Sequence, residues 1–341
     1  MKILCSADWH LDAPMAAQDE ALRQALLSVP GQVAEVCRRE QCDLVLLAGD
    51  LFDGPYTEKS LRVLTQALAD MAVPVFISPG NHDFLGGNSP WNQEIFPENV
   101  HIFKNPRLEA VRLGDLTVYG AGYTSMDCPA LLENFRAEEN SLCVLHADPT
   151  AATSAYCPVS RSQVENSNLK LLALGHIHKA GAFTAGSTLC LWPGCPAGRG
   201  YDETGPKGVY VVELADSEYR FIPLENPRFF DLSVAADQLD TVLPAAESQD
   251  YYRVTLTGAC QSPDLEALSA KYAHIPHLTL RDRTVAPLDI WGSAGDDSFE
   301  GVYFGLLRQA MDSAPDHEKE IPLLAAKLSR QLLTGQEVAL P

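Results

Sequence analysis

The sequence predicts an α/β (α+β) fold: a two-sheet β-sandwich flanked by helices, followed by a small C-terminal α/β module and a helical tail. Three observations predict it. Short apolar runs alternate with helical stretches from the N-terminus to about residue 99, a pattern typical of α/β layers. Beyond that point the chain changes to short strands joined by tight turns. Its 341 residues suffice for one large domain and a smaller one.

The first part of the chain alternates strands and helices. Apolar runs at 3–6 and 44–47 predict buried strands. The segment 17–41 between them has apolar residues close to helical spacing, and Pro30-Gly31 is expected to break or kink that helix. Thr57 can cap a second helix, which leads into the next strand.

The following part is expected to contain antiparallel strands. Gly114-Asp115 fits the turn of a two-residue hairpin. Further strands are expected near Phe183 and Leu189, and at 209–214 and 219–224.

The sequence suggests three parts. The first is a large domain over 1–225, and the second is a small α/β capping module over 226–290 with a strand, a helix and a strand between 251 and 280. The third is a helical tail over 291–341, in which apolar residues from Phe299 to Ala310 and from Leu324 to Leu332 recur at helical spacing. The two tail helices either pack within the chain or dock a partner, and the sequence leaves both possibilities open.

Composition restricts the function. The chain has 25 Lys and Arg against 45 Asp and Glu, a formal net charge of -20. Strong unaided binding to DNA or to an anionic membrane is therefore not expected. The nine scattered cysteines include no C-x-x-C pair. Because the sequence also shows no secretory signal and no apolar run long enough to span a membrane, a cytoplasmic location is expected.

Seven residues with oxygen or nitrogen donors follow apolar runs, at points where strands are expected to end. They are Asp8, His10, Asp50, Asn81, His146, His176 and His178. The set contains no thiolate, so it suits Mn, Fe or Zn. Seven donors exceed what one ion needs, so two divalent ions are expected, bridged by one carboxylate and roughly 3.5–4 Å apart.

The motifs that carry these residues occur in a fixed order. They are Asp8-Trp9-His10, Gly49-Asp50, Gly80-Asn81-His82-Asp83, His146 and Gly175-His176-Ile177-His178. In type and order they resemble the calcineurin-like metallophosphoesterase superfamily, over roughly 1–212. The resemblance implies that fold and a pair of ions, with Mn favoured over Fe or Zn. The implied ligands of the first ion are Asp8, His10 and His178. Those of the second are Asn81, His146 and His176, and Asp50 would bridge the two.

The resemblance also implies roles for residues that hold no metal. His82 would be the general acid, which stabilises the transition state and protonates the leaving oxygen. Asp53 lies three residues after Asp50 in a G-D-x-x-D pattern, so it would orient His82 or be a simple turn residue. Arg199 would contact a phosphate or form a structural ion pair.

Within the superfamily the sequence most resembles the DNA repair exonuclease branch that includes SbcD and YhaO. The resemblance rests on residues 43–53, 174–179 and the loop 193–208. It implies a Mn-dependent DNA exonuclease or endonuclease in DNA repair, an SbcC-like coiled-coil ATPase subunit that binds the tail, and a homodimer. One alternative is a phosphodiesterase or phosphatase acting on a small or cyclic nucleotide. Another is a non-catalytic scaffold, which is disfavoured because no motif residue is missing.

Overall fold

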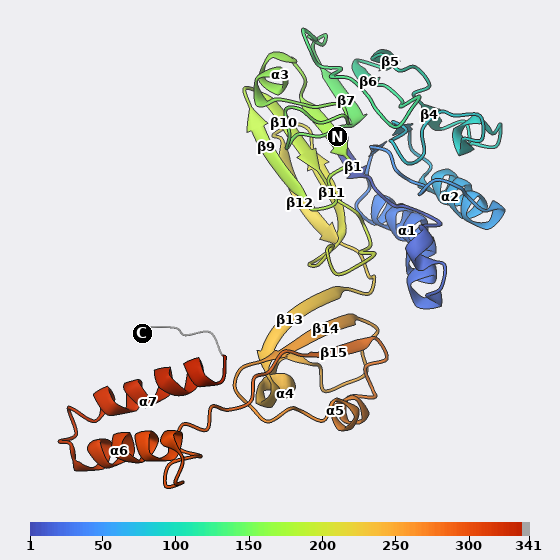
Figure 1. The fold of residues 1–341 in the computed structure, drawn as a ribbon. Helices are drawn as coiled ribbons and strands as arrows, with labels where there is room; N and C mark the ends of the chain where they lie inside the picture. The colour runs from blue at the N-terminus through green and yellow to red at the C-terminus, as the bar shows by residue number, and fades with distance from the viewer. Residues whose placement is uncertain (336–341) are drawn as a thin grey trace. The chain divides into compact units, whose positions relative to one another are not determined.

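The computed structural model describes residues 1–335, which form two compact units (Figure 1). The first unit contains Met1–Phe230 and Gln249–Tyr251, and the second contains the other residues from Asp231 onward. The predicted α/β class is confirmed. The three-part division at residues 225 and 290 stays a prediction. No helix among the described residues is both long enough and apolar enough to cross a bilayer.

The first sheet of the first unit has the strand order β12-β11-β1-β2-β3-β4. Its strands are β1 (Lys2–Ser6), β2 (Leu44–Leu47), β3 (Val75–Ile77), β4 (Val100–Ile102), β11 (Gly208–Glu213) and β12 (Glu218–Pro223). Strands β1 to β4 are parallel, whereas β11 is antiparallel to both of its neighbours. The carboxyl ends of β1, β2 and β3 therefore lie at the same edge of the sheet.

The second sheet has the order β5-β6-β7-β8-β10-β9. Its strands are β5 (Glu109–Leu113), β6 (Leu116–Gly120), β7 (Ser141–His146), β8 (Leu171–Gly175), β9 (Gly181–Ala185) and β10 (Thr188–Trp192). The four inner strands are parallel and the two edge strands antiparallel. Leu113 pairs with Leu116, so the hairpin turn predicted at Gly114-Asp115 is confirmed.

The two sheets pack face to face, and helices cover their outer faces (Figure 1). Alternate side chains of each strand point to opposite faces. Ile3 of β1 accordingly packs between the sheets. Its neighbour Leu4 packs in the layer formed by α1 (Glu20–Arg39) and α2 (Glu58–Met71). On the outer face of the second sheet lies α3 (Arg161–Asn166). Two short 3₁₀ helices, η1 (Pro14–Ala16) and η2 (Pro90–Asn92), lie in loops of this unit.

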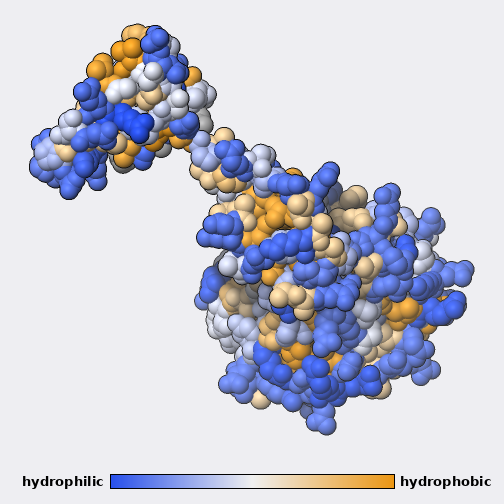
Figure 2. Space-filling model, turned by 90° about the horizontal axis from the view of Figure 1, so that it is seen from below, coloured by the Kyte–Doolittle hydropathy of each residue, from blue (hydrophilic) through white to orange (hydrophobic). Residues whose placement is uncertain are grey.

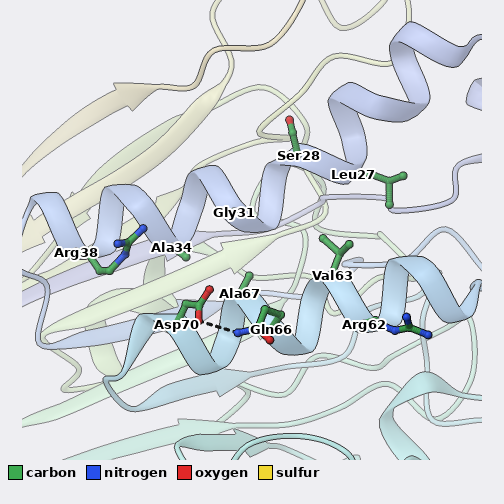
Figure 3. Close-up of a pocket in the computed structure, with 10 residues that line it drawn as sticks. All are labelled: Leu27, Ser28, Gly31, Ala34, Arg38, Arg62, Val63, Gln66, Ala67 and Asp70. Carbon is green, nitrogen blue, oxygen red and sulfur yellow. Dashed lines mark hydrogen bonds between the residues drawn. The ribbon is translucent and has the colours of Figure 1, made fainter.

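Of the break or kink expected at Pro30-Gly31, the break does not occur, whereas the axis of α1 bends between Ser28 and Gly31 (Figure 3). The single helix α1 continues through Pro30, which is buried. Proline removes one backbone hydrogen bond, but burial of the apolar face on both sides of it supplies most of the stability of such a helix. The second helix begins as predicted, because the side chain of Thr57 accepts the backbone N–H of Ser60.

The second unit begins within a three-stranded sheet of order β13-β14-β15. Its elements are β13 (Phe229–Ala235), η3 (Ala236–Gln238), α4 (Leu239–Val242), β14 (Tyr251–Thr257), α5 (Leu265–Lys271) and β15 (Leu278–Asp282). Strands β14 and β15 are parallel. The strand, helix and strand expected between 251 and 280 are therefore confirmed.

Two helices complete the second unit, α6 (Phe299–Ser313) and α7 (Glu320–Leu333). Phe304 and Ala326 are fully buried, and the guanidinium of Arg330 lies 3.8 Å from the centre of the Phe304 ring. The apolar stripe expected on the first of these helices is largely exposed, with Phe299 at 88% and Leu306 at 62%. Apolar side chains gather on the surface of this helical pair, at the upper left of Figure 2.

Candidate metal centre and active site

Five parallel strands bring the predicted ligands to one edge of the sandwich. In the first sheet β1 is followed by Asp8 and His10, β2 by Asp50 and β3 by Asn81. In the second sheet His146 is the last residue of β7, and His176 and His178 follow β8. Residues that are far apart in the sequence thus meet where the carboxyl ends of both sets of parallel strands lie.

The loops after these strands turn sharply. Four predicted ligands have a left-handed backbone, with φ of 54° at Asp8, 48° at His10, 50° at Asp50 and 88° at His176. Glycine precedes two of them, Asp50 and His176, and a Cβ on Gly175 would lie 1.9 Å from the carbonyl oxygen of Ala48. The ends of β2 and β8 therefore lie closer together than they could if residue 175 had a side chain.

Asp8, His10 and His178 form the first group of converging donors, with ligand atoms within 4.8 Å of one another. Asp8 and His10 are fully buried. The Nε2 atoms of His10 and His178 are 3.1 Å apart, and both carboxylate oxygens of Asp8 accept the backbone N–H of His176. These are the three residues predicted to bind the first ion.

Asp8, Asp50 and His146 form a second group of the same kind. Asn81 joins it, with Oδ1 2.9 Å from Nε2 of His146. The ring of His176 lies beside His146, at 5.3 Å between ring centroids, but it is not a member of either group. The structure therefore brings Asn81 and His146 together with His176 beside them, and their binding of a second ion stays a prediction.

Asp50 lies between the two groups. One carboxylate oxygen, Oδ2, is 4.0 Å from Nε2 of His10 and 3.3 Å from Nε2 of His146. The other, Oδ1, accepts the backbone N–H of His82 at 2.8 Å. Burial raises the pKa of Asp50, but the neighbouring imidazoles lower it by more, so this pKa lies well below its usual range. A carboxylate in this position can bind a cation on either side.

The surroundings of His146 fit a cation. Nδ1 is 2.9 Å from the carbonyl oxygen of Ala48, which can only accept, so Nδ1 is the donor. The lone pair of Nε2 then faces Oδ1 of Asn81 and the carboxylate of Asp50, which are acceptors too. Burial lowers the pKa of His146, but the charge of Asp50 raises it by more, to about 9. A proton satisfies these acceptors, and a divalent metal ion would satisfy them in the same place.

His82 lies beside the two groups and is the most exposed imidazole of the site, with 43% of its side chain exposed against 30% for His178. Its Nδ1 is 2.5 Å from Oδ1 of Asp53, and this hydrogen bond raises the pKa of His82 above its ordinary value. Asp53 is also 3.5 Å from Nδ1 of His10, and these three side chains form a third group of converging donors. Asp53 thus lies between His82 and the first group of donors, and its role in orienting His82 stays a prediction.

Arg199 and Glu203 form a buried ion pair next to His178, with side chains 8% and 7% exposed. The guanidinium of Arg199 also lies 3.6 Å from Asp53. Burial raises the pKa of Glu203, but hydrogen bonds from His178 and Arg199 lower it by more, to well below its usual range. Of the two roles considered for Arg199, the ion pair is present, and contact with a phosphate stays a prediction.

Two residues received no role from the sequence, Glu203 and Asp83. The Asp83 carboxylate is buried and accepts backbone N–H groups of Gly80 at 2.7 Å, Leu51 at 2.8 Å and Phe52 at 3.3 Å. It joins the loop that carries Asn81 to the loop that carries Asp50. The only sequence signal was its place at the end of the Gly-Asn-His-Asp motif.

Two cavities differ in their relation to this site. One, of about 330 Å³, is lined by His82 together with Pro55, Phe84, Asn88 and Pro90. A larger one, of about 470 Å³, lies between α1 and α2 (Figure 3). None of the predicted site residues lines the larger cavity. The smaller one therefore offers the space next to the candidate general acid.

Buried carboxylates and imidazoles that converge at the strand ends of an α/β sandwich, beside an exposed imidazole, define a metal-dependent phosphoester hydrolase. The chain belongs to the calcineurin-like phosphoesterase family, whose sequence model matches residues 1–180. The family implies a pair of metal ions, and the donors described above fit such a pair. The resemblance inferred from the motifs is thereby confirmed.

Named relatives agree with this family. The chain is 29% identical over 243 residues to the uncharacterized metallophosphoesterase YhaO of Bacillus subtilis (strain 168), covering 63% of this chain and 58% of that protein. It is 24% identical over 272 residues to the SbcD subunit of the nuclease SbcCD of Staphylococcus saprophyticus, covering 67% and 70%. Among solved structures, a dimetal phosphatase from Danio rerio is similar at 13% identity and a TM-score of 0.42, covering 62% and 91%.

Proposed function

We propose that this chain is a Mn-dependent nuclease that hydrolyses DNA, as an exonuclease or endonuclease subunit in DNA repair. The observation that carries the proposal is the placement of His82. Its Nδ1 is held by Asp53 at 2.5 Å, and its side chain is 43% exposed beside two groups of converging donors. DNA as the substrate is proposed from similarity to relatives named as nuclease subunits.

The residues of this chain divide the work of hydrolysis. Asp8, His10 and His178 would hold one ion, and Asn81, His146 and His176 the other, with Asp50 between them. Bound divalent ions supply a nucleophile at neutral pH and neutralise charge on the phosphate. Asp53 fixes Nδ1 of His82, so Nε2 is the nitrogen free to face the leaving oxygen. A proton given from Nε2 to that oxygen lets the ester bond break.

The proposal is tested with purified protein, Mn²⁺, single- and double-stranded DNA and bis-p-nitrophenyl phosphate, with and without the ATPase partner. We expect nucleotide release from DNA that requires both Mn²⁺ and His82. No release from any DNA, even with the partner, would refute nuclease activity. Hydrolysis restricted to small or cyclic nucleotides would support the phosphodiesterase alternative.

We further propose that the helical pair α6 and α7 docks a coiled-coil ATPase subunit, by analogy with the partnership implied by the name SbcCD. More than half of the large exposed apolar side chains among the described residues lie on this pair: Phe299, Val302, Tyr303, Leu306, Ile321, Leu324, Leu332 and Leu333. A net charge of -20 also favours a partner that contributes to DNA binding. Loss of co-purification in a Phe299→Asp/Leu306→Asp variant is the expected result.

A cytoplasmic location is proposed from the cysteines. All nine are free, and eight of them are buried. Burial raises the pKa of thiols such as Cys5 and Cys190, which keeps them protonated and unreactive. Such a set suits a reducing compartment, and fractionation of cells with an antibody against the chain would check it.

A further inference from the structure

We propose that Glu203 is a positioning residue that holds the imidazole of His178 with its proton on Nδ1, so that Nε2 is always ready to bind the first metal ion. The inference deepens the proposed function and rests on metal binding by His178. Glu203 lies 25 residues after His178 in the sequence, in the loop 193–208 that also carries Arg199, and the motifs give Glu203 itself no role.

The carboxylate of Glu203 is saturated by donors. Oε1 is 2.7 Å from Nδ1 of His178 and 2.6 Å from one terminal nitrogen of Arg199. Oε2 accepts the backbone N–H of Arg199 at 2.8 Å and its Nε–H at 3.3 Å. A buried carboxylate bonded to a guanidinium in this way stays ionised and can only accept. Nδ1 of His178 must therefore be the donor in their hydrogen bond.

This bond determines which nitrogen of His178 is available. A neutral imidazole carries one proton, and when that proton is on Nδ1 the lone pair is on Nε2. Nε2 is the atom that faces Nε2 of His10 at 3.1 Å, within the first group of donors. Arg199 also approaches Nδ1, at 2.9 Å. Because a guanidinium only donates, that contact would favour the opposite tautomer if Glu203 were absent.

Arg199 extends the effect of Glu203 toward the candidate general acid. Its guanidinium bonds to Glu203 on one side and lies 3.6 Å from the carboxylate of Asp53 on the other. Asp53 in turn holds Nδ1 of His82. The buried ion pair of Arg199 and Glu203 therefore supports two side chains. One is His178, a predicted ligand of the first ion, and the other is Asp53, which holds His82. Loss of such a supporting partner typically costs 10–100-fold in metal affinity or activity.

The variants Glu203→Ala and Glu203→Gln test the inference. The amide oxygen of Gln can still accept the Nδ1–H of His178, whereas Ala cannot. In ¹⁵N-histidine NMR of the metal-free protein, with His178 assigned by a His178→Gln variant, we expect the Nδ1–H tautomer in the wild type and in Glu203→Gln. We expect the Nε2–H tautomer in Glu203→Ala.

A Mn²⁺ titration followed by EPR gives the second readout. One of the two ions should bind about 10–100-fold more weakly to Glu203→Ala than to the wild type, and the affinity for the other ion should change little. Both affinities of Glu203→Gln should be close to those of the wild type. Glu40→Ala, which removes an ion pair to Arg220 elsewhere in the first unit, is the matched control. If Glu203→Ala does not fold, the variants Glu203→Gln and Arg199→Ala decide. The inference is overturned if Glu203→Gln loses the Nδ1–H tautomer of His178. It is also overturned if Glu203→Gln binds the first ion more weakly and Arg199→Ala does not.

An unchanged tautomer and unchanged affinity in folded Glu203→Ala would also overturn it. Equal losses of first-ion affinity in Glu203→Ala and Glu203→Gln would also overturn the inference. The charge of the Arg199–Glu203 ion pair, rather than the hydrogen bond from Glu203 to His178, would then determine metal binding. Neither readout requires catalysis. A protein that binds Mn²⁺ as described but leaves DNA intact would refute the nuclease proposal and leave this inference standing.

Discussion

His82 is the most exposed imidazole of the site, at 43% against 30% for His178, and Asp53 holds its Nδ1. If it protonates the leaving oxygen, His82→Ala should slow DNA hydrolysis by about 10²–10⁴-fold. The loss should be smaller for bis-p-nitrophenyl phosphate, whose p-nitrophenolate leaves without a proton. Parallel rate measurements on both substrates, with Mn²⁺ content as the control, check this. Equal losses on the two substrates would argue against a general acid.

Asp50 is the residue whose loss should affect both ions. Its Oδ2 lies between His10 and His146, and asparagine keeps the shape but loses the charge. In Asp50→Asn we expect both steps of a Mn²⁺ titration to weaken. Retention of two ions at wild-type affinity would show that Asp50 does not bridge.

The residues at the strand ends could be predicted from the sequence, but their supporting partners could not. Asp8, Asp50 and His146 each follow or end an apolar run, so their meeting at a sheet edge follows from parallel strands. Glu203 and Asp83 act across 25 and 32 residues, through loops whose path no periodicity encodes. Ligand type is a local property of the sequence, whereas hydrogen bonds between loops are set only by the folded chain.

Among the elements, α2 depends on a residue of the ligand loop. The carboxylate of Asp12 accepts the backbone N–H of Thr57 at 2.7 Å and also bonds to Ser60, next to the N-terminal cap of the helix. Asp12→Gly removes the carboxylate and tolerates the left-handed backbone of this residue, with φ of 61°, and it should lower the free energy of unfolding by about 1–2 kcal/mol. Denaturant unfolding measures this change, and Glu133→Gly at an exposed position serves as control. An unchanged midpoint would show that Thr57 caps α2 without help.

The tail helices allow a matched comparison on one helix. Phe304 is fully buried under Arg330, whereas Phe299 is 88% exposed. Phe304→Ala should cost about 3–5 kcal/mol and Phe299→Ala should cost little. Hydrogen exchange of α6 and α7 reports both. Similar protection in the two variants would mean that the helices are not held by this contact.

Two helices also show what the spacing of apolar residues does not determine. The helix pattern around Pro30 was right, but proline did not break the helix, because a buried face can outweigh one missing hydrogen bond. In α6 the spacing correctly predicted a helix with an apolar stripe, and it left open whether that stripe packs within the chain or docks a partner. The stripe from Phe299 to Leu306 is mostly exposed, and Phe304, which lies outside the stripe, is buried. A helix can have more than one apolar face, and which face is buried depends on the element that packs against it.

At the scale of the whole molecule, every predicted ligand belongs to the first unit. Mn²⁺ at 100 times its dissociation constant should add about 2.7 kcal/mol to the stability of that unit. Hydrogen exchange with and without EDTA is expected to show protection gained within residues 1–230 and none within 252–335. Equal gains in both units would show that their stabilities are coupled.

The left-handed backbone at four predicted ligands affects how mutagenesis of this site must be interpreted. Alanine at such a φ costs roughly 1–2 kcal/mol in backbone energy alone, so alanine scanning at Asp8, His10, Asp50 or His176 would combine a lost donor with a distorted loop. Asparagine tolerates the same φ far better. Scanning with asparagine would measure the chemistry of each ligand, and the difference between the two scans would measure how much the loops depend on their geometry.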